Sequence, residues 1–146
     1  MTSDFGPLVT LDDPAFIHPT ALIYGKATFR AGSSLWANAV VRAEAFEIEV
    51  GEHTNIQDFV MIHVGARNGT KIGAHCTVAH HCTIHGAQIG DNCLIGINAT
   101  LMDESVIGAN SIVAGGAFVP HRMVVPENAI VMGVPAKVTG SQNNWA

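Results

Sequence analysis

The stretch IGDNCLIGINATLMDESVIG, residues 89–108, decides the fold, because its pattern returns every six residues. A large aliphatic side chain opens each hexad, and glycine often follows it directly. An α-helix would show a period of 3.6 residues and a simple strand a period of 2, so neither explains a period of six. The pattern extends in both directions, with a three-residue slip before Val50, a four-residue insertion before Ile72 and one residue skipped before Ile89. Its members are Ile17, Ile23, Phe29, Leu35, Val41, Val50, Ile56, Ile62, Ile72, Val78, Ile84, Ile89, Ile95, Leu101, Ile107, Val113, Val119 and Val125.

A period of six predicts a solenoid of triangular cross-section. Each hexad forms one short strand and one corner, three hexads complete a coil, and coils stack about 4.8 Å apart through parallel β pairing. The first residue of a hexad points into the prism. The fifth also points inward and is small, as at Ser33, Val60, Cys76, Cys82, Cys93, Ala99, Ser111 and Ala117. We therefore expect an all-β fold, a single-stranded left-handed parallel β-helix of hexapeptide repeats with little or no C-terminal helix.

The composition favours one small domain that binds neither nucleic acid nor membrane. A length of 146 residues suits one domain. Seven Lys and Arg residues against twelve Asp and Glu argue against a polyanionic partner. No secretory signal or membrane span is visible, and three inward cysteines suit a reducing compartment, so we expect a cytoplasmic protein. The expected organisation is an entry segment 1–16, a solenoid over about 17–138 and a short tail 139–146.

Three of the eight histidines are placed by the repeat where they can bind one metal ion. His63 and His85 each follow an inward aliphatic, and their separation of 22 residues is one coil of 18 plus a four-residue insertion in the loop 64–70. Both imidazoles therefore stand on one face, about one strand spacing apart. His80 leaves the prism from another face, so a second subunit must bring it to the ion. The pattern predicts a homotrimer with interfacial sites, each having three protein ligands and one open position.

Four further polar residues share these faces. Arg42 lies one coil before the first ligand histidine on the same face, and Asp58 stacks below His80, beside Gln57. A carboxylate or an amide in that place can orient a metal-bound water or accept its proton. We expect Arg42 either to pair with Asp58 or Glu44 across the interface or to hold an anion such as bicarbonate. The other histidines are assigned to structural or solvated positions: His18, His53, His75, His81 and His121.

Several motifs resemble those of the γ-class carbonic anhydrases: Val41-Arg42-Ala43-Glu44, Val50-Gly51, Thr54-Asn55-Ile56-Gln57-Asp58, His63, His80, His85-Gly86 and Gly133-Val134-Pro135-Ala136-Lys137. The resemblance covers roughly residues 10–138 and implies a homotrimer that hydrates carbon dioxide reversibly to bicarbonate. It implies Zn²⁺, with Fe²⁺ or Co²⁺ as alternatives, held by His63 and His85 of one subunit and His80 of the next. It also implies that Gln57 contacts the metal-bound water, within a polar network that includes Arg42 and Asp58.

Three departures from that family pattern lead us to expect a weak activity. Arg42-Ala43-Glu44 stands where the family has Arg-Gly-Asp, and the loop 64–70 carries no acid where well-known active members have a proton-exporting glutamate. The sequence also gives no signal for the family's C-terminal helix. Two alternatives stay open: an acyltransferase or thioesterase acting on coenzyme A thioesters, with His80 or His85 as base, and a catalytically weak metal-binding trimer. Three histidines meeting at one point favour the metal-dependent hydration.

Overall fold

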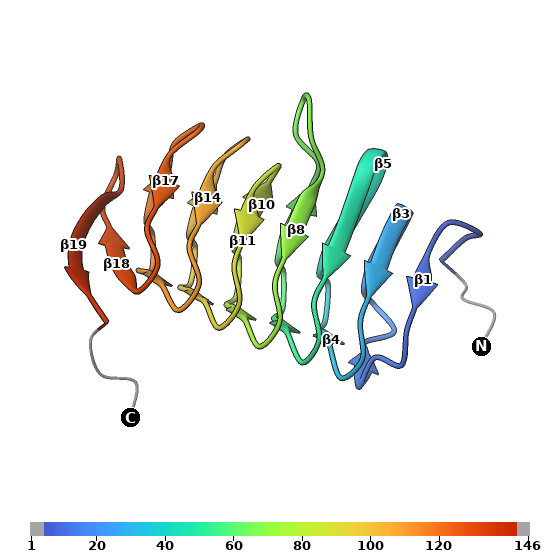
Figure 1. Cartoon of the computed structure of the whole chain (residues 1–146). Coiled ribbons are helices and arrows are strands. Elements are labelled where there is room, and N and C mark those ends of the chain that lie inside the picture. The colour runs from blue at the N-terminus through green and yellow to red at the C-terminus, as the bar shows by residue number, and fades with distance from the viewer. Residues whose placement is uncertain (1–4, 143–146) are drawn as a thin grey trace.

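The computed structural model describes residues 5–142, and every regular element in that range is a β-strand. The coils stack side by side from β1 at one end to β19 at the other (Figure 1). The fold is a left-handed parallel β-helix of hexapeptide repeats, so the fold predicted from the period of six is confirmed. Within the described range, no helix is long and apolar enough to cross a membrane.

Two sheets form the three walls of the prism. An eight-stranded sheet makes one wall, and an eleven-stranded sheet makes the other two, because its long strands continue round a corner. The β5 strand, for example, pairs with β7 through its first residues and with β8 through its last. The strands are β1 (Thr10–Leu11), β2 (Phe16–Ile17), β3 (Leu22–Phe29), β4 (Ser34–Leu35), β5 (Val40–Val50), β6 (Asn55–Ile56), β7 (Met61–His63), β8 (Thr70–Ile72), β9 (Thr77–Val78), β10 (Thr83–His85), β11 (Gln88–Ile89), β12 (Leu94–Ile95), β13 (Thr100–Leu101), β14 (Val106–Ile107), β15 (Ile112–Val113), β16 (Phe118–Val119), β17 (Val124–Val125), β18 (Ala129–Met132) and β19 (Lys137–Ser141).

The core is the column of side chains that the repeat assigns to the inside. Each predicted aliphatic from Ile23 to Val125 is at most 3% exposed, and Ile17 packs against the same cluster from a partly buried position. The fifth positions are equally buried, including Ser33 and the three cysteines. The cysteines are therefore packing residues, as predicted. Burial raises the pKa of Cys82 to about 11, so this thiol stays protonated at neutral pH.

The corners place many residues in the left-handed backbone region. Five asparagines adopt positive φ values there, which their short polar side chains tolerate: Asn38, Asn92, Asn98, Asn110 and Asn128. Aromatic rings take equivalent corners in earlier coils. His53 stacks on His75 with ring centroids 5.2 Å apart, and Phe59 stacks on His81 at 5.0 Å. Three of the histidines that the sequence assigns to structural positions thus form stacked corners.

The two ends differ from the sequence-based boundaries. Parallel pairing begins at β1, within the expected entry segment, because Leu11 extends the six-residue series below Ile17 and packs on the core. At the other end, β19 turns back and pairs antiparallel with β18. The expected tail therefore starts as a strand, which a parallel hexad pattern does not predict. Residues 143–146 of that tail lie outside the described residues.

Candidate metal centre

Two histidines converge on the outer side of adjacent coils. His63 ends β7, His85 ends β10, and the two residues are direct partners in the parallel register. Nδ1 of His63 lies 3.2 Å from Nε2 of His85. Two nitrogens bound to one tetrahedral zinc, each at 2.0–2.1 Å, are about 3.3 Å apart. The observed spacing therefore suits two ligands of one ion.

A carboxylate holds the far nitrogen of each ring. Glu44 Oε1 lies 2.7 Å from Nε2 of His63, and Asp103 Oδ1 contacts Nδ1 of His85. Metal-binding histidines usually donate their second ring N–H to such a carboxylate, which fixes the ring and its tautomer. The hydrogen bond with His63 lowers the pKa of Glu44. Burial opposes ionisation of Asp103, but the hydrogen bonds from Ala66 and His85 outweigh it and lower the pKa of that carboxyl.

Arg42 belongs to the same cluster. It is the register partner of His63, one coil earlier, as the repeat predicts. Its Nη1 lies 2.5 Å from Glu44 Oε1, the oxygen that also contacts His63. The sequence suggested a pair across an interface, whereas this pair forms within one chain. The reason is that Arg42 and Glu44 are two residues apart on one strand, so both side chains leave it on the same side.

His80 lies in the turn after β9, a strand of the eight-stranded sheet, whereas His63 and His85 end strands of the eleven-stranded sheet. Nδ1 of His80 is 3.5 Å from Oδ2 of Asp58, within ion-pair range but longer than a hydrogen bond. Both line a pocket of about 260 Å³ together with Trp36, Asn55 and Gln57. His80, Asp58 and Gln57 are thus brought together, but apart from the His63–His85 pair. Within residues 5–142, no three His, Cys, Asp or Glu side chains of one chain are arranged to hold a metal ion.

Sequence reasoning missed Asp103. The coil that follows β10 is 17 residues long, since Ile84 pairs with Leu101, so the residue in register with His85 would be Met102. Asp103 stands one place further on and reaches His85 from there, so the count that paired the two histidines does not point to it. Trp36 was missed too, although it follows the inward Leu35 on the wall that carries Gln57. Trp36 is 41% exposed and lines that pocket.

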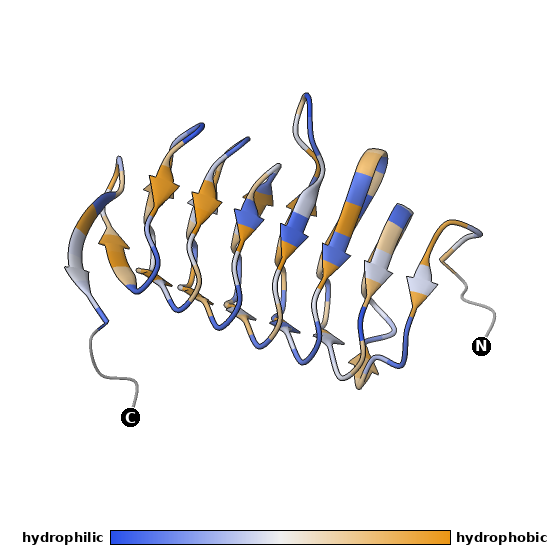
Figure 2. Ribbon diagram, in the orientation of Figure 1, coloured by the Kyte–Doolittle hydropathy of each residue, from blue (hydrophilic) through white to orange (hydrophobic). Residues whose placement is uncertain are grey.

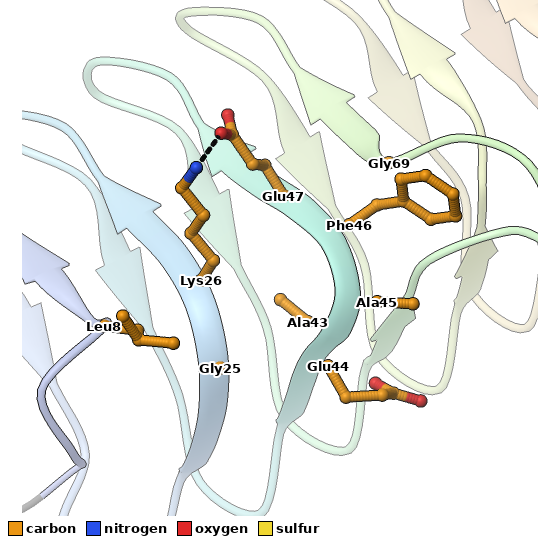
Figure 3. Close-up of a pocket in the computed structure, with 9 residues that line it drawn as sticks. All are labelled: Leu8, Gly25, Lys26, Ala43, Glu44, Ala45, Phe46, Glu47 and Gly69. Carbon is orange, nitrogen blue, oxygen red and sulfur yellow. Dashed lines mark ion pairs between the residues drawn. The ribbon is translucent and has the colours of Figure 1, made fainter.

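A larger pocket of about 550 Å³ lies beside the histidine pair, between β3 and β5. Lys26 reaches from β3 to Glu47 on β5, and Glu44 lies at the other end of the same stretch of β5 (Figure 3). Glu44 is the residue common to the pocket and the cluster of charged groups around His63. The lining residues are Leu8, Gly25, Lys26, Ala43, Glu44, Ala45, Phe46, Glu47 and Gly69.

Comparison with known proteins places the chain among hexapeptide-repeat proteins. A family profile described as "Bacterial transferase hexapeptide (six repeats)" matches residues 86–121. The Arabidopsis thaliana protein "Gamma carbonic anhydrase 2, mitochondrial" is 36% identical over 140 residues, covering 92% of this chain and 50% of the relative. The chain therefore spans about half the length of that relative.

Two further proteins are matched over most of their own length. The Methanocaldococcus jannaschii protein named "Probable carbonic anhydrase" is 39% identical over 118 residues, covering 81% of this chain and 74% of the relative. A hexapeptide transferase family protein from Anaplasma phagocytophilum superposes with a TM-score of 0.87 at 32% identity, covering 91% of this chain and 78% of that structure.

Proposed function

The chain belongs to the γ-class carbonic anhydrase family of hexapeptide-repeat proteins, and we propose that it hydrates carbon dioxide reversibly to bicarbonate at a metal centre. One observation carries the proposal: His63 Nδ1 and His85 Nε2 lie 3.2 Å apart, while carboxylates hold the opposite ring nitrogens. Imidazole nitrogens of this kind suit Zn²⁺, and they also suit Fe²⁺ or Co²⁺. Relatives from a plant and an archaeon carry carbonic anhydrase in their names.

The proposed centre is shared between subunits of a homotrimer. His63 and His85 supply two ligands from one wall, and His80 of the neighbouring subunit supplies the third from another wall. Support comes from the places of these residues, with His63 and His85 at the ends of β7 and β10 and His80 in the turn after β9, and from the lack of any three-residue metal site within residues 5–142 of one chain. Three protein ligands leave one position open, as catalytic sites require. The unpaired, buried thiols favour a reducing compartment, and we propose the cytoplasm.

The remaining polar residues have separate roles in this proposal. A divalent ion bound there supplies Lewis-acid chemistry that lowers the pKa of a water toward about 7. The Gln57 amide lines the His80 pocket and is placed to orient the attacking oxygen by a hydrogen bond. Arg42 offers guanidinium N–H donors to the bicarbonate, and Glu44 holds both Arg42 and His63 in place. Asp58 would steady His80 as Glu44 steadies His63.

The reaction is tested on purified protein by metal analysis and stopped-flow hydration of carbon dioxide. We expect about one zinc, iron or cobalt ion per subunit, and hydration that His85→Ala abolishes. Protein that holds no metal, even after reloading, would contradict the proposal. Hydration that persists at the same rate in His85→Ala would do so as well.

Subunit mixing tests the shared site. Trimers made from equal amounts of His63→Ala and His80→Ala subunits should regain about a quarter of the sites, because a random pair of neighbours supplies an intact set with that frequency. A mixture of His63→Ala with His85→Ala is the matched control. Both lesions then fall in the same half of the site, so no intact set forms. Equal recovery in the two mixtures would show that the three histidines are not divided between subunits as proposed.

A second candidate is chemistry on coenzyme A thioesters, with His80 or His85 as base. The likeness to a transferase family in sequence profile and in solved structure favours it. Incubation with acetyl-coenzyme A, with and without an amine acceptor, distinguishes transfer from hydrolysis. If the protein binds metal but shows neither thioester chemistry nor hydration, the third option stands, a catalytically weak metal-binding trimer.

A further inference from the structure

We propose that Asp103 is a positioning residue that joins the loop 64–70 to the ligand His85, so that metal binding and loop order depend on each other. The proposal rests on the metal function proposed for His85. It concerns a residue that neither the repeat nor the resemblance to the carbonic anhydrases assigns.

The two oxygens of Asp103 have different partners. Oδ1 contacts Nδ1 of His85, and Oδ2 accepts the backbone N–H of Ala66 at 2.9 Å. An ionised carboxylate has no proton to donate, so Nδ1 of His85 must carry the hydrogen of this contact. In a neutral imidazole that tautomer leaves Nε2 without a hydrogen, and Nε2 is the atom that faces His63. The side chain of Asp103 is only 14% exposed, which shields both contacts from water.

The loop is also fastened near both ligands. The Thr70 hydroxyl donates to the carbonyl of His63 at 2.6 Å and accepts the N–H of Gly86 at 2.9 Å. The Asn68 amide donates to the carbonyl of Gly86 at 2.8 Å. These bonds hold the end of the loop, whereas the bond from Ala66 to Asp103 holds its beginning.

Close packing leaves the loop little freedom to move while Asp103 stays in place. A Cβ on Gly65 would lie 2.9 Å from Oδ2 of Asp103, and a Cβ on Gly86 would lie 2.8 Å from Cα of Gly65. The loop therefore approaches the carboxylate as closely as glycine permits. One carboxylate contacts both the loop and His85, so the two equilibria are coupled. If an ordered loop strengthens metal binding, bound metal stabilises the ordered loop by the same free energy.

The test compares Asp103→Asn with Glu104→Gln. Asparagine keeps one acceptor oxygen, so it cannot serve both partners as the carboxylate does. Glu104→Gln removes the same charge one residue away, where the carboxylate pairs with Arg122 on the surface. In chelator competition on the assembled protein, Asp103→Asn should weaken zinc binding 10- to 100-fold, a usual effect of losing such a partner. Glu104→Gln should change zinc binding less than about twofold.

Two readouts separate positioning from a merely structural role. Nitrogen-15 NMR of the metal-free protein should show His85 protonated at Nδ1 in the wild type and as a tautomer mixture in Asp103→Asn. Trypsin cleavage after Arg67, which is exposed in the loop, should slow several-fold when zinc binds to the wild type and should not slow in Asp103→Asn.

The outcomes distinguish this proposal from the one on which it rests. If the wild type and Glu104→Gln bind no zinc, the proposed metal function fails. If Asp103→Asn binds zinc as tightly as the wild type, keeps the His85 tautomer and keeps the zinc-dependent protection at Arg67, the role of Asp103 is overturned while the metal function stands.

Discussion

The solenoid has an interrupted part, residues 22–88, and a regular part, residues 89–131, and the two share one core. In the regular part the hexads follow without a break, and β12 to β17 have two residues each. In the interrupted part β3 has eight residues, β5 has eleven, and the loop 64–70 leaves one corner. Inward side chains do not distinguish the two, since Ile62 and Ile95 are both 0% exposed.

The outward side chains do differ between the two parts. In Figure 2, β14, β17 and β18 are predominantly hydrophobic, whereas β5 alternates between hydrophobic and hydrophilic residues. In the interrupted part, four outward polar groups meet in one cluster, which Asp103 of the regular part joins through His85: Arg42, Glu44, His63 and His85. The inside of the prism thus fixes the fold in both parts. The polar groups of the candidate metal centre lie beside the long strand β5 and the loop 64–70, where side chains of neighbouring coils contact each other.

The largest effect should come from emptying the core, and it should be the same in both parts. Ile72→Ala and Ile107→Ala each truncate a side chain that is at most 1% exposed. Each should lower the free energy of unfolding by about 2–5 kcal/mol, as such truncations usually do. The control Val124→Ala changes a side chain that is 68% exposed and should cost less than about 0.5 kcal/mol. Urea unfolding measures the free energy of unfolding of all three variants. A loss of stability at only one of the two isoleucines would show that the two parts do not share one core.

A smaller and unequal effect should follow from adding a methyl group at two glycines. Gly116, in the regular part, has φ +71° and nothing near its missing Cβ, so Gly116→Ala should cost about 1–2 kcal/mol from backbone strain alone. Gly86 has φ +63° and lies against the loop, so Gly86→Ala should cost at least about 1 kcal/mol more. Thermal unfolding of both variants measures the difference. Equal losses of stability in the two variants would show that the loop 64–70 moves away from the added methyl group at no cost.

A third pair of variants separates stability from turnover. Arg42 pairs with Glu44 in the interrupted part, and Arg122 pairs with Glu104 in the regular part. Both pairs are solvent-exposed, so Arg42→Ala and Arg122→Ala should each change the free energy of unfolding by less than about 1 kcal/mol. Only Arg42→Ala should slow carbon dioxide hydration, by about tenfold or more, since an Arg contact to an anion is charge-assisted. Equal rates in the two variants would remove Arg42 from the site.

The smallest effect should be that of pH on the reactivity of the inward thiol of Cys82 in the native protein. Burial raises its pKa to about 11, and the residue is 1% exposed. A thiol reagent at pH 8 should therefore react with it very slowly in the native protein and rapidly in urea. Raising the pH toward 11 without unfolding should speed the native reaction only modestly, because access still limits it. Mass spectrometry of the Cys82 peptide gives both rates, and fast native labelling would mean that the prism opens locally.

The six-residue repeat also decides which features of the structure the sequence could predict. A period of six assigns every residue a direction, so the burial of Ile95 and the pairing of His63 with His85 follow from counting. The contact between Asp103 and His85 depends on a side chain reaching across a corner beside the loop, which periodicity alone does not describe. The antiparallel β19 carries no hexad pattern. Whether His80 joins the other two histidines depends on a second subunit, so the three-histidine site stays a prediction.

The antiparallel strand β19 changes what the C-terminal end of the stacked coils offers to another chain. A stack of parallel coils presents at its end an open ladder of backbone donors and acceptors, onto which another copy could add indefinitely. Here β19 lies antiparallel on β18, and the turn before it bonds to β16, where Phe118 donates its N–H to Gly133 and accepts that of Ala136. Two walls of the prism are thereby closed to further parallel growth. The last turn of the chain thus works as a terminator, favouring a finite particle over a fibre.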